Sequence, residues 1–254
     1  MGGLTVVREM IRQLPHESII YFGDTARVPY GPKSPDTVLR YSREITAYLK
    51  AEGVKALVIA CNTATAHALP ALRREYDMPI VGVIEPGARA AAAATRTKRV
   101  GVIGTAGTIK SRAYEKEIIK LVPDAQVTAQ ACALFVPLVE EGWTDAEPTR
   151  AIARNYLAPL VAAEIDTLVL GCTHYPLMKT VIGNVVGRGV RLIDSAYETA
   201  RETAQLLKAN GLENKSPNEA RYRFIASDAP DTFLALGERF LGSAIDRVET
   251  RTLG

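Results

Sequence analysis

Two short segments, 111 residues apart, share one pattern: an apolar, β-branched run that ends in a cysteine. The first is Ala56-Leu-Val-Ile-Ala-Cys61-Asn62-Thr63, and the second is Thr167-Leu-Val-Leu-Gly-Cys172-Thr173-His174. Each run predicts a buried strand, and the small polar residues after each cysteine can begin a helix. Because buried strands that alternate with helices form parallel sheets, this repeat favours an α/β fold.

The same alternation of strands and helices continues along the chain. One expected helix, Thr63–Tyr76, should be interrupted or kinked at Pro70, and Glu85-Pro-Gly87 predicts a turn. The expected strands are Ser18–Phe22, Val54–Ala60, Ile80–Ile84, Arg99–Gly104, Gln126–Ala131, Thr167–Leu170, Leu192–Asp194 and Tyr222–Ala226. The sequence therefore predicts mainly parallel sheets.

The repeat predicts two similar α/β domains that are related by pseudo-symmetry. Ligands of parallel sheets bind beyond the carboxyl ends of the strands, so we expect the active site in the cleft between the domains, beside both cysteines. The second unit opens with the strand Arg99–Gly104, whereas the first begins at Gly2-Gly3, directly before a helix from Leu4. This symmetry predicts that about ten residues, one strand and its turn, are absent from the amino end. The alternative is that the halves share only general α/β character.

Composition excludes several classes of protein. The net charge of +3 is too mild to indicate nucleic acid or an acidic membrane surface. No apolar run reaches the ~18 residues of a membrane span, and no signal peptide opens the chain. Three cysteines do not make a disulfide scaffold, which favours a reduced, cytoplasmic protein. The three cysteines and three histidines lack metal-ligand spacing, and Gly101-x-x-Gly104-x-x-Gly107 is not a dinucleotide loop, so no metal or cofactor is expected.

Cysteines at the ends of two facing strands suit the inversion of one carbon atom. One thiolate can remove a proton from one face while the other thiol supplies a proton to the opposite face. A helix amino end favours the thiolate, and both Cys61 and Cys172 precede an expected helix start. His174 could exchange a proton with Cys172. Cys132, in an apolar stretch, is interpreted as a core residue.

Polar residues near the expected helix starts suit the binding of an amino acid. Hydroxyl, amide and backbone N–H groups at such positions bind carboxylates. The residues are Asn62, Thr63, Thr105, Thr108 and Thr173. Because the α-proton of an amino acid is weakly acidic, the site must stabilise a carbanion electrostatically and exclude water.

Longer stretches around these residues resemble the glutamate racemases of the aspartate/glutamate racemase family. The resemblance runs from the first residues to about residue 200. The matching stretches are Gly2-Gly-Leu-Thr-Val6, Tyr21-Phe-Gly-Asp-Thr-Ala-Arg-Val-Pro-Tyr-Gly31, Val58-Ile-Ala-Cys-Asn-Thr-Ala64, Gly82-Val-Ile-Glu-Pro-Gly87, Gly101-Val-Ile-Gly-Thr-Ala-Gly-Thr108, Phe135-Val-Pro-Leu-Val-Glu-Glu-Gly142, Leu168-Val-Leu-Gly-Cys-Thr-His-Tyr-Pro176 and Ile193-Asp-Ser-Ala196.

The resemblance implies cofactor-independent racemisation of L- and D-glutamate, an isomerase activity that supplies D-glutamate for peptidoglycan and hence cell-wall synthesis. It implies Cys61 and Cys172 as the two bases, His174 as the partner of Cys172, and Glu140 as polar support. Substrate contacts are implied for Tyr30-Gly31, Asn62-Thr63 and Thr173-His174. It also implies a homodimer, with 1–84 plus 197–254 as the first domain and 85–196 as the second.

One departure from the family concerns the amino end. The family begins with a strand and then Asp-Ser-Gly-Val-Gly-Gly-Leu-Thr-Val, and here Met1 stands at the position of the first valine. The family's Asp-Ser pair contacts substrate, and its aspartate assists the first cysteine. We therefore expect a first domain short of one strand and a weakened Cys61 side, explained by a misassigned start at a GTG codon.

Three other functions are weighed against this one. The chain could be a catalytically impaired racemase homologue that acts as a binding protein, since some glutamate racemases inhibit DNA gyrase. It could racemise another acidic amino acid, such as aspartate. A thiol redox protein is the third alternative, and the lack of a C-x-x-C motif argues against it.

Overall fold

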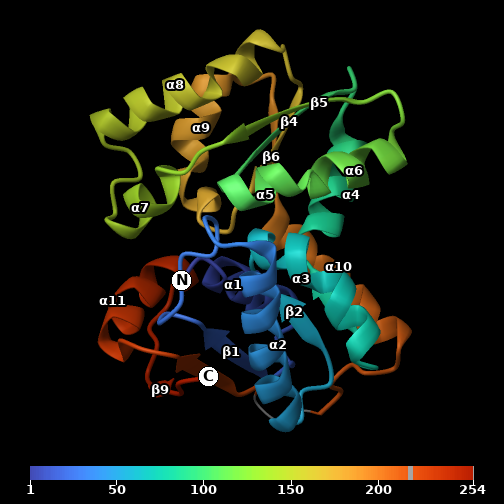
Figure 1. Cartoon of the computed structure of the whole chain (residues 1–254), viewed down its shortest axis with the longest axis vertical. Helices are drawn as coiled ribbons and strands as arrows, with labels where there is room; N and C mark the ends of the chain where they lie inside the picture. Colours follow the sequence, from blue (N-terminus) through green and yellow to red (C-terminus); the bar gives the residue numbers. More distant parts are fainter. Residues whose placement is uncertain (217–219, 254) are drawn as a thin grey trace.

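A computed structural model gives the structure of the chain and describes residues 1–216 and 220–253. Figure 1 shows two lobes stacked along the long axis, each with strands at its centre and helices around them. In every paired set of strands the neighbours run parallel. The prediction of an α/β fold with mainly parallel sheets is therefore confirmed.

The upper lobe in Figure 1 contains a four-stranded sheet in the order β5-β4-β6-β7. Its strands are β4 (Arg99–Gly104), β5 (Gln126–Ala131), β6 (Thr167–Gly171) and β7 (Arg191–Asp194). All five residues of β6 are buried, as expected for a central parallel strand that is covered on both faces. The carboxyl end of β6 leads directly to Cys172.

The lower lobe contains two smaller sheets. One has the order β1-β8-β9, from β1 (Ile19–Gly23), β8 (Tyr222–Ala226) and β9 (Val248–Thr250), and the other pairs β2 (Leu57–Ile59) with β3 (Ile80–Gly82). Within residues 1–216 and 220–253, no strand pairs with the second edge of β1 or of β2. The carboxyl end of β2 leads through Ala60 to Cys61.

Helices connect and cover these strands. They are α1 (Leu4–Gln13), α2 (Pro35–Ala51), α3 (Asn62–Glu75), α4 (Ile84–Ala94), α5 (Ala106–Ser111), α6 (Ala113–Leu121), α7 (Phe135–Glu140), α8 (Glu147–Ala162), the 3₁₀ turn η1 (Tyr175–Met178), α9 (Lys179–Val186), α10 (Ser195–Ala209) and α11 (Pro230–Leu241). The chain changes lobe twice, because α4 leaves the end of β3 and packs on α6, whereas α10 leaves the end of β7 and packs on α1.

The structure corrects three local predictions, two of them only in part. Glu85-Pro-Gly87 is not a turn, because α4 begins at Ile84 and Pro86 stands in its first turn, where a missing N–H costs no hydrogen bond. Of the two outcomes expected at Pro70, an interruption is excluded, since α3 continues from Asn62 to Glu75 with Pro70 inside it, and the kink stays a prediction. The strand expected at Ile80–Ile84 is shorter than predicted. Strand β3 ends at Gly82, and Ile84 is the first residue of α4.

Asp166 holds the loop before β4 against the start of β6. Its carboxylate accepts hydrogen bonds from the hydroxyl of Thr95 (2.7 Å) and from the backbone N–H groups of Arg96 and Thr97 (2.6 Å each). Burial alone would raise the pKa of this carboxyl, but these hydrogen bonds outweigh burial and lower it. The ionised form is therefore the one that stabilises the fold.

We expect Asp166→Asn to lower the free energy of unfolding at pH 7 by about 1 kcal/mol, because the partly exposed donors of Thr95, Arg96 and Thr97 lose an ionised acceptor. Since the folded-state pKa is depressed, this contribution is complete above the unfolded pKa of about 3.9 and is lost as pH falls further. Denaturant unfolding at pH 7 and at pH 3 checks this. Asp124→Asn, which removes an exposed ion pair with Lys98, is the control; equal losses in both variants would contradict the prediction.

Candidate active site

The two cysteines line one large cavity that lies between the lobes and extends into the lower one. Its volume is about 1080 Å³. Most residues singled out from the sequence line it, namely Tyr30, Gly31, Cys61, Asn62, Thr63, Thr105, Glu140, Cys172, Thr173 and His174. Thr108 is the exception: it is buried behind Thr63 and Thr105 and does not line the cavity, so the predicted contact between Thr108 and substrate is not supported.

Cys61 stands at the amino end of α3 as its N-cap. The backbone of Cys61 is still extended, as in the strand β2 that precedes it. Its Sγ accepts a hydrogen bond from the backbone N–H of Ala64 at 3.5 Å. The side chain remains partly accessible, because it faces the cavity. Burial nevertheless raises the pKa of the Cys61 thiol, and the hydrogen bonds from Ala64 and Thr63 offset this only in part. The helix amino end therefore does not make Cys61 a thiolate by itself, contrary to the simple expectation.

Cys172 belongs to a chain of three polar side chains. Its Sγ lies 3.7 Å from Nδ1 of His174, and Nε2 of His174 lies 3.0 Å from Oε1 of Glu140. The hydrogen bond to His174 lowers the pKa of Glu140, which keeps that carboxyl ionised. Burial lowers the pKa of His174 in spite of Glu140, so the imidazole is neutral at pH 7. A neutral imidazole beside a thiol can accept its proton.

The surroundings of Cys172 favour the protonated thiol. Only 7% of the residue is exposed, and burial raises its pKa to about 12, although the backbone N–H of His174 acts in the opposite direction. The sequence predicted a helix start here, but Cys172 is followed by a short 3₁₀ turn, with His174 as its N-cap. Gly2 lies against the imidazole, since a Cβ there would approach Nδ1 of His174 to 2.4 Å. A side chain at this position would displace His174.

Asn62 joins the lobes and keeps one donor free. Its Oδ1 accepts a hydrogen bond from the hydroxyl of Tyr114 in α6 at 2.7 Å. Its Nδ2 is buried and has no hydrogen-bond partner among the described residues. Because a buried N–H without a partner is costly, this amide is a donor that a molecule bound in the cavity could use.

Three threonine hydroxyls meet where α3 and α5 approach each other. The Oγ1 of Thr63 lies 2.9 Å from that of Thr105 and 3.3 Å from that of Thr108. Thr105 also caps α5 by accepting from the N–H of Thr108. Nearby, the N–H of Gly107 donates to the carbonyl of Gly31 at 3.1 Å. These contacts fix the loop of Tyr30 and Gly31, from the lower lobe, against the upper lobe.

Asp24 holds the same loop from below. Its carboxylate accepts from the hydroxyl of Tyr30, from the guanidinium of Arg27 at 2.9 Å and from the hydroxyl of Ser227 at 3.1 Å. Asp24 follows β1, and Ser227 follows β8, so the paired carboxyl ends of these strands position Tyr30.

Sequence reasoning missed three residues that support the site. They are Asp24, Tyr114 and Arg239; Nη1 of Arg239, in α11, donates to the backbone carbonyl of Glu140 at 3.0 Å. Asp24 lies within one of the stretches that resemble the racemase family, and it directly follows an expected strand. These two features could have identified it as a residue of the site. Tyr114 and Arg239 lie on helices without any local motif, and only the packing of the two lobes brings them to the site.

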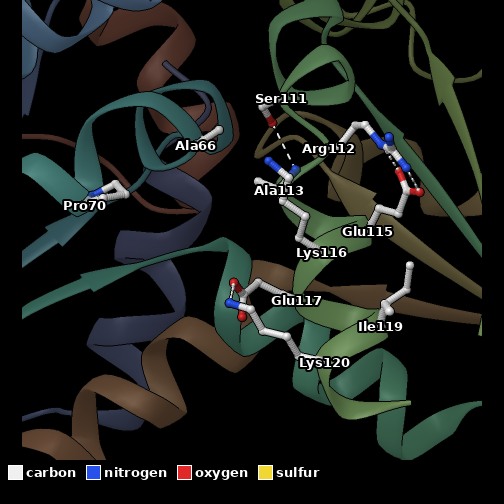
Figure 2. A pocket seen from close by; sticks show the side chains of 10 residues that line it. All are labelled: Ala66, Pro70, Ser111, Arg112, Ala113, Glu115, Lys116, Glu117, Ile119 and Lys120. Carbon is white, nitrogen blue, oxygen red and sulfur yellow. Dashed lines mark hydrogen bonds and ion pairs between the residues drawn. The ribbon is translucent and has the colours of Figure 1, made fainter. Parts of the chain in front are cut away.

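A second pocket lies apart from both cysteines. Figure 2 shows it between α3 and α6, with Ala66 and Pro70 on one side and Arg112 to Lys120 on the other. Its volume is about 560 Å³, and its charges are largely paired internally, Arg112 with Glu115 and Lys120 with Glu117. It contains neither cysteine nor histidine, so it lacks groups for proton transfer near pH 7.

In the part of the chain that the structure describes, no group of three or more histidine, cysteine, aspartate or glutamate side chains is arranged to hold a metal ion. None of its helices is long and apolar enough to cross a membrane.

Comparison with known proteins gives consistent matches. The family model described as Asp/Glu/Hydantoin racemase matches residues 2–203. The glutamate racemase of Geobacter metallireducens is 55% identical over 248 residues, which are 98% of this chain and 92% of the relative. Among solved structures, glutamate racemase isoform RacE1 from Bacillus anthracis is 43% identical with a TM-score of 0.95, covering 98% of this chain and 93% of that one. Glutamate racemase from Francisella tularensis, in complex with D-glutamate, is 36% identical with a TM-score of 0.92, covering 99% and 94%.

The three thiols should differ in reactivity. We expect iodoacetamide to modify Cys61 first, because it is partly accessible, and Cys132 last, because it is fully buried. With a pKa of about 12, Cys172 should react about tenfold faster for each pH unit between 7 and 10. Peptide mass spectrometry over time measures all three rates, and modification of Cys132 as fast as Cys61 would contradict this arrangement.

Proposed function

The chain belongs to the Asp/Glu/Hydantoin racemase family and interconverts L- and D-glutamate, and we propose that Cys61 and Cys172 are its two bases. The observation that supports this most directly is that both thiols line one cavity, each at the carboxyl end of a strand from a different lobe. Two sulfur atoms that are held by opposite lobes can face the two sides of one carbon atom.

In the proposed reaction, one cysteine is a thiolate and the other is a thiol. The thiolate takes the proton from the α-carbon of glutamate, and the electron pair of that C–H bond remains on the carbon. The thiol then donates its proton to the opposite face, which inverts the configuration. The two cysteines end with their protonation states exchanged, so the reverse reaction uses the same groups in opposite roles.

The raised thiol pKa values contribute directly to this chemistry. The α-proton of an amino acid is far less acidic than an ordinary thiol, so a thiolate of high pKa is a better matched base. Burial raises the pKa of both Cys61 and Cys172. The same burial lowers the fraction of each sulfur that is ionised, and for Cys172 the neutral His174, held by Glu140, can store the proton.

Neutral donors are proposed to bind the carboxylates of glutamate. Among the described residues, Lys55 is the only lysine or arginine on the cavity wall, and it is paired with Glu17. The buried Nδ2 of Asn62 and the hydroxyls of Thr63 and Thr105 are therefore the donors near Cys61, and Thr173 and the Tyr30-Gly31 segment complete the set. Preorganised donors of this kind also stabilise negative charge as it develops.

Further proposals concern the biological role, the location, the assembly and the domains of the protein. We propose that the product D-glutamate supplies peptidoglycan synthesis, that the protein acts in the cytoplasm, and that it forms a homodimer. We also propose a first domain of 1–84 plus 197–254 and a second of 85–196. This division is supported by the sheets, since every strand of the β5-β4-β6-β7 sheet falls within 85–196.

Replacing either base should abolish inversion. We expect Cys61→Ser and Cys172→Ser each to lower the racemisation rate by about 10³-fold or more, because a serine hydroxyl is a much weaker acid than a thiol and is not ionised near pH 7. Racemisation in D₂O, followed by circular dichroism and by mass spectrometry of deuterium at the α-carbon, measures the effect. Cys132→Ala is the matched control and should retain activity. Full inversion in both serine variants would refute the assignment, and a wild-type protein that incorporates no deuterium would instead favour a binding role.

Protonation of His174 should limit activity at acid pH. Because the pKa of His174 is lowered, the acid limb of kcat/KM should lie below its ordinary value of 6.5. Glu140→Gln removes a hydrogen bond that raises this pKa, so the limb should move to still lower pH, with kcat reduced about tenfold. The adjacent, exposed Glu141→Gln is the control. An acid limb that stays in place in Glu140→Gln would show that His174 does not set it.

Arg239 is a positioning residue in this scheme, because it holds the backbone of Glu140 from the other lobe. We expect Arg239→Met, which keeps the alkyl stem, to lower kcat about fivefold, equivalent to about 1 kcal/mol, with KM little changed. Steady-state kinetics in both directions check this against Arg201→Met, an exposed arginine paired with Glu198. A rise in KM at constant kcat would contradict the positioning role.

A further inference from the structure

One side-chain contact joins the wall of the large cavity to the opposite lobe. Asn62, the first residue of α3, lines the cavity beside Cys61, and Tyr114 of α6 reaches it from the upper lobe. Both residues are enclosed by the protein, since Asn62 is 3% exposed and Tyr114 is 2% exposed. The hydroxyl of Tyr114 donates to Oδ1 of Asn62 at 2.7 Å, so this contact is a buried hydrogen bond between the lobes.

This hydrogen bond determines which end of the amide is left for a ligand. An asparagine side chain has an acceptor oxygen at one end and two N–H donors at the other. With Oδ1 of Asn62 held by Tyr114, the donor end remains, and Nδ2 has no partner among the described residues. If the amide were turned over, its carbonyl oxygen would meet the carboxylate of a ligand, with no proton between the two oxygen atoms.

The surroundings of Tyr114 direct its proton toward Asn62. The other acceptor near the hydroxyl, the backbone carbonyl of Val83, lies 3.4 Å away, which is a longer and weaker contact than the bond to Asn62. Burial raises the pKa of Tyr114, and a hydrogen bond with Ser195 offsets this only in part. The hydroxyl is therefore protonated near pH 7 and acts as a donor.

Two glycines leave room for the ring of Tyr114. A Cβ at Gly87 would lie 3.2 Å from its hydroxyl, and a Cβ at Gly171 would lie 3.0 Å from Cε2 of its ring. Gly87 belongs to α4, and Gly171 ends β6, directly before Cys172. Because the ring is confined by two elements, its hydroxyl has a fixed position relative to Asn62.

We propose that Tyr114 is a positioning residue, whose hydroxyl orients the amide of Asn62 so that Nδ2 donates to a carboxylate of the substrate. This rests on the proposed function, in which Asn62 is one of the donors to glutamate. It assigns the orientation of a lower-lobe donor to a side chain of the upper lobe. The donor is therefore in place only while the two lobes hold the arrangement that brings Tyr114 to Asn62.

A double-mutant cycle separates positioning from packing. Tyr114→Phe keeps the ring and removes the hydroxyl, and we expect it to lower kcat/KM for both enantiomers of glutamate about tenfold, because the amide of Asn62 can then turn over. In the Asn62→Ala background, the same change should lower kcat/KM by less than about twofold, since no amide is left to orient. Tyr156→Phe removes a hydroxyl of α8 that accepts from the backbone N–H of Leu134, away from the cavity wall, and should leave kcat/KM unchanged. Equal losses in both backgrounds would overturn the proposal, because Tyr114 would then act through packing alone.

The amide of Asn62 also gives a reading that requires no turnover. Its side-chain ¹⁵N–¹H signals, assigned by their loss in Asn62→Ala, are followed by NMR as D-glutamate is added. We expect a shifted, sharp pair of signals at saturation in the wild-type protein, and broadened signals without that shift in Tyr114→Phe. An unchanged response in Tyr114→Phe would overturn the proposal, even if Asn62→Ala is too inactive for kinetics. A wild-type protein whose amide responds but which racemises no glutamate would contradict the proposed function and would still support this role of Tyr114.

Discussion

Desolvation of two thiols in a shared cavity is the condition on which the chemistry of this protein depends. For Cys172, a pKa of about 12 in place of 9.0 corresponds to about 4 kcal/mol of extra free energy in the thiolate form. That energy makes the sulfur a stronger base toward carbon, and it comes from the burial of Cys172 at the end of β6. The fold thus contributes to reactivity by withholding water rather than by supplying positive charge.

The two thiols are supported in different ways, although the lobes repeat one plan. Cys172 faces an imidazole and a carboxylate in series, so its proton has a defined acceptor. Cys61 has the backbone N–H groups of Thr63 and Ala64 at a helix start, which stabilise charge but accept no proton. We therefore interpret the pair as chemically unequal, with the two directions of the reaction depending on different surroundings.

The sequence predicted the parts of this structure that are encoded locally. The strand–cysteine units, the alternation of strands and helices and the fold class followed from apolar runs and turn residues, whereas β9 was not predicted. Pro86 misled the prediction, because proline favours both turns and first turns of helices, and only packing decides between them. Thr108 was misplaced because a strand end specifies a region and not the direction of each side chain. Tyr114 and Arg239 could not be found, since their roles arise from contacts between lobes. The ligand roles of Asn62, Thr63, Thr105 and Thr173 were inferred from expected helix starts, and those of Tyr30 and Gly31 came from the family resemblance. All of them remain proposals.

The double crossing of the chain has a mechanical consequence. The lobes are joined at two places, where β3 passes into α4 and where β7 passes into α10. Two connections define a line, and a body held at two points on a line can rotate about it but cannot slide or twist freely. Rotation about this line would change both the separation of the two sulfurs and the angle at which they face each other, and closure of the lobes restores one arrangement of the pair. A substrate carbon would meet the same pair of directions each time the lobes close.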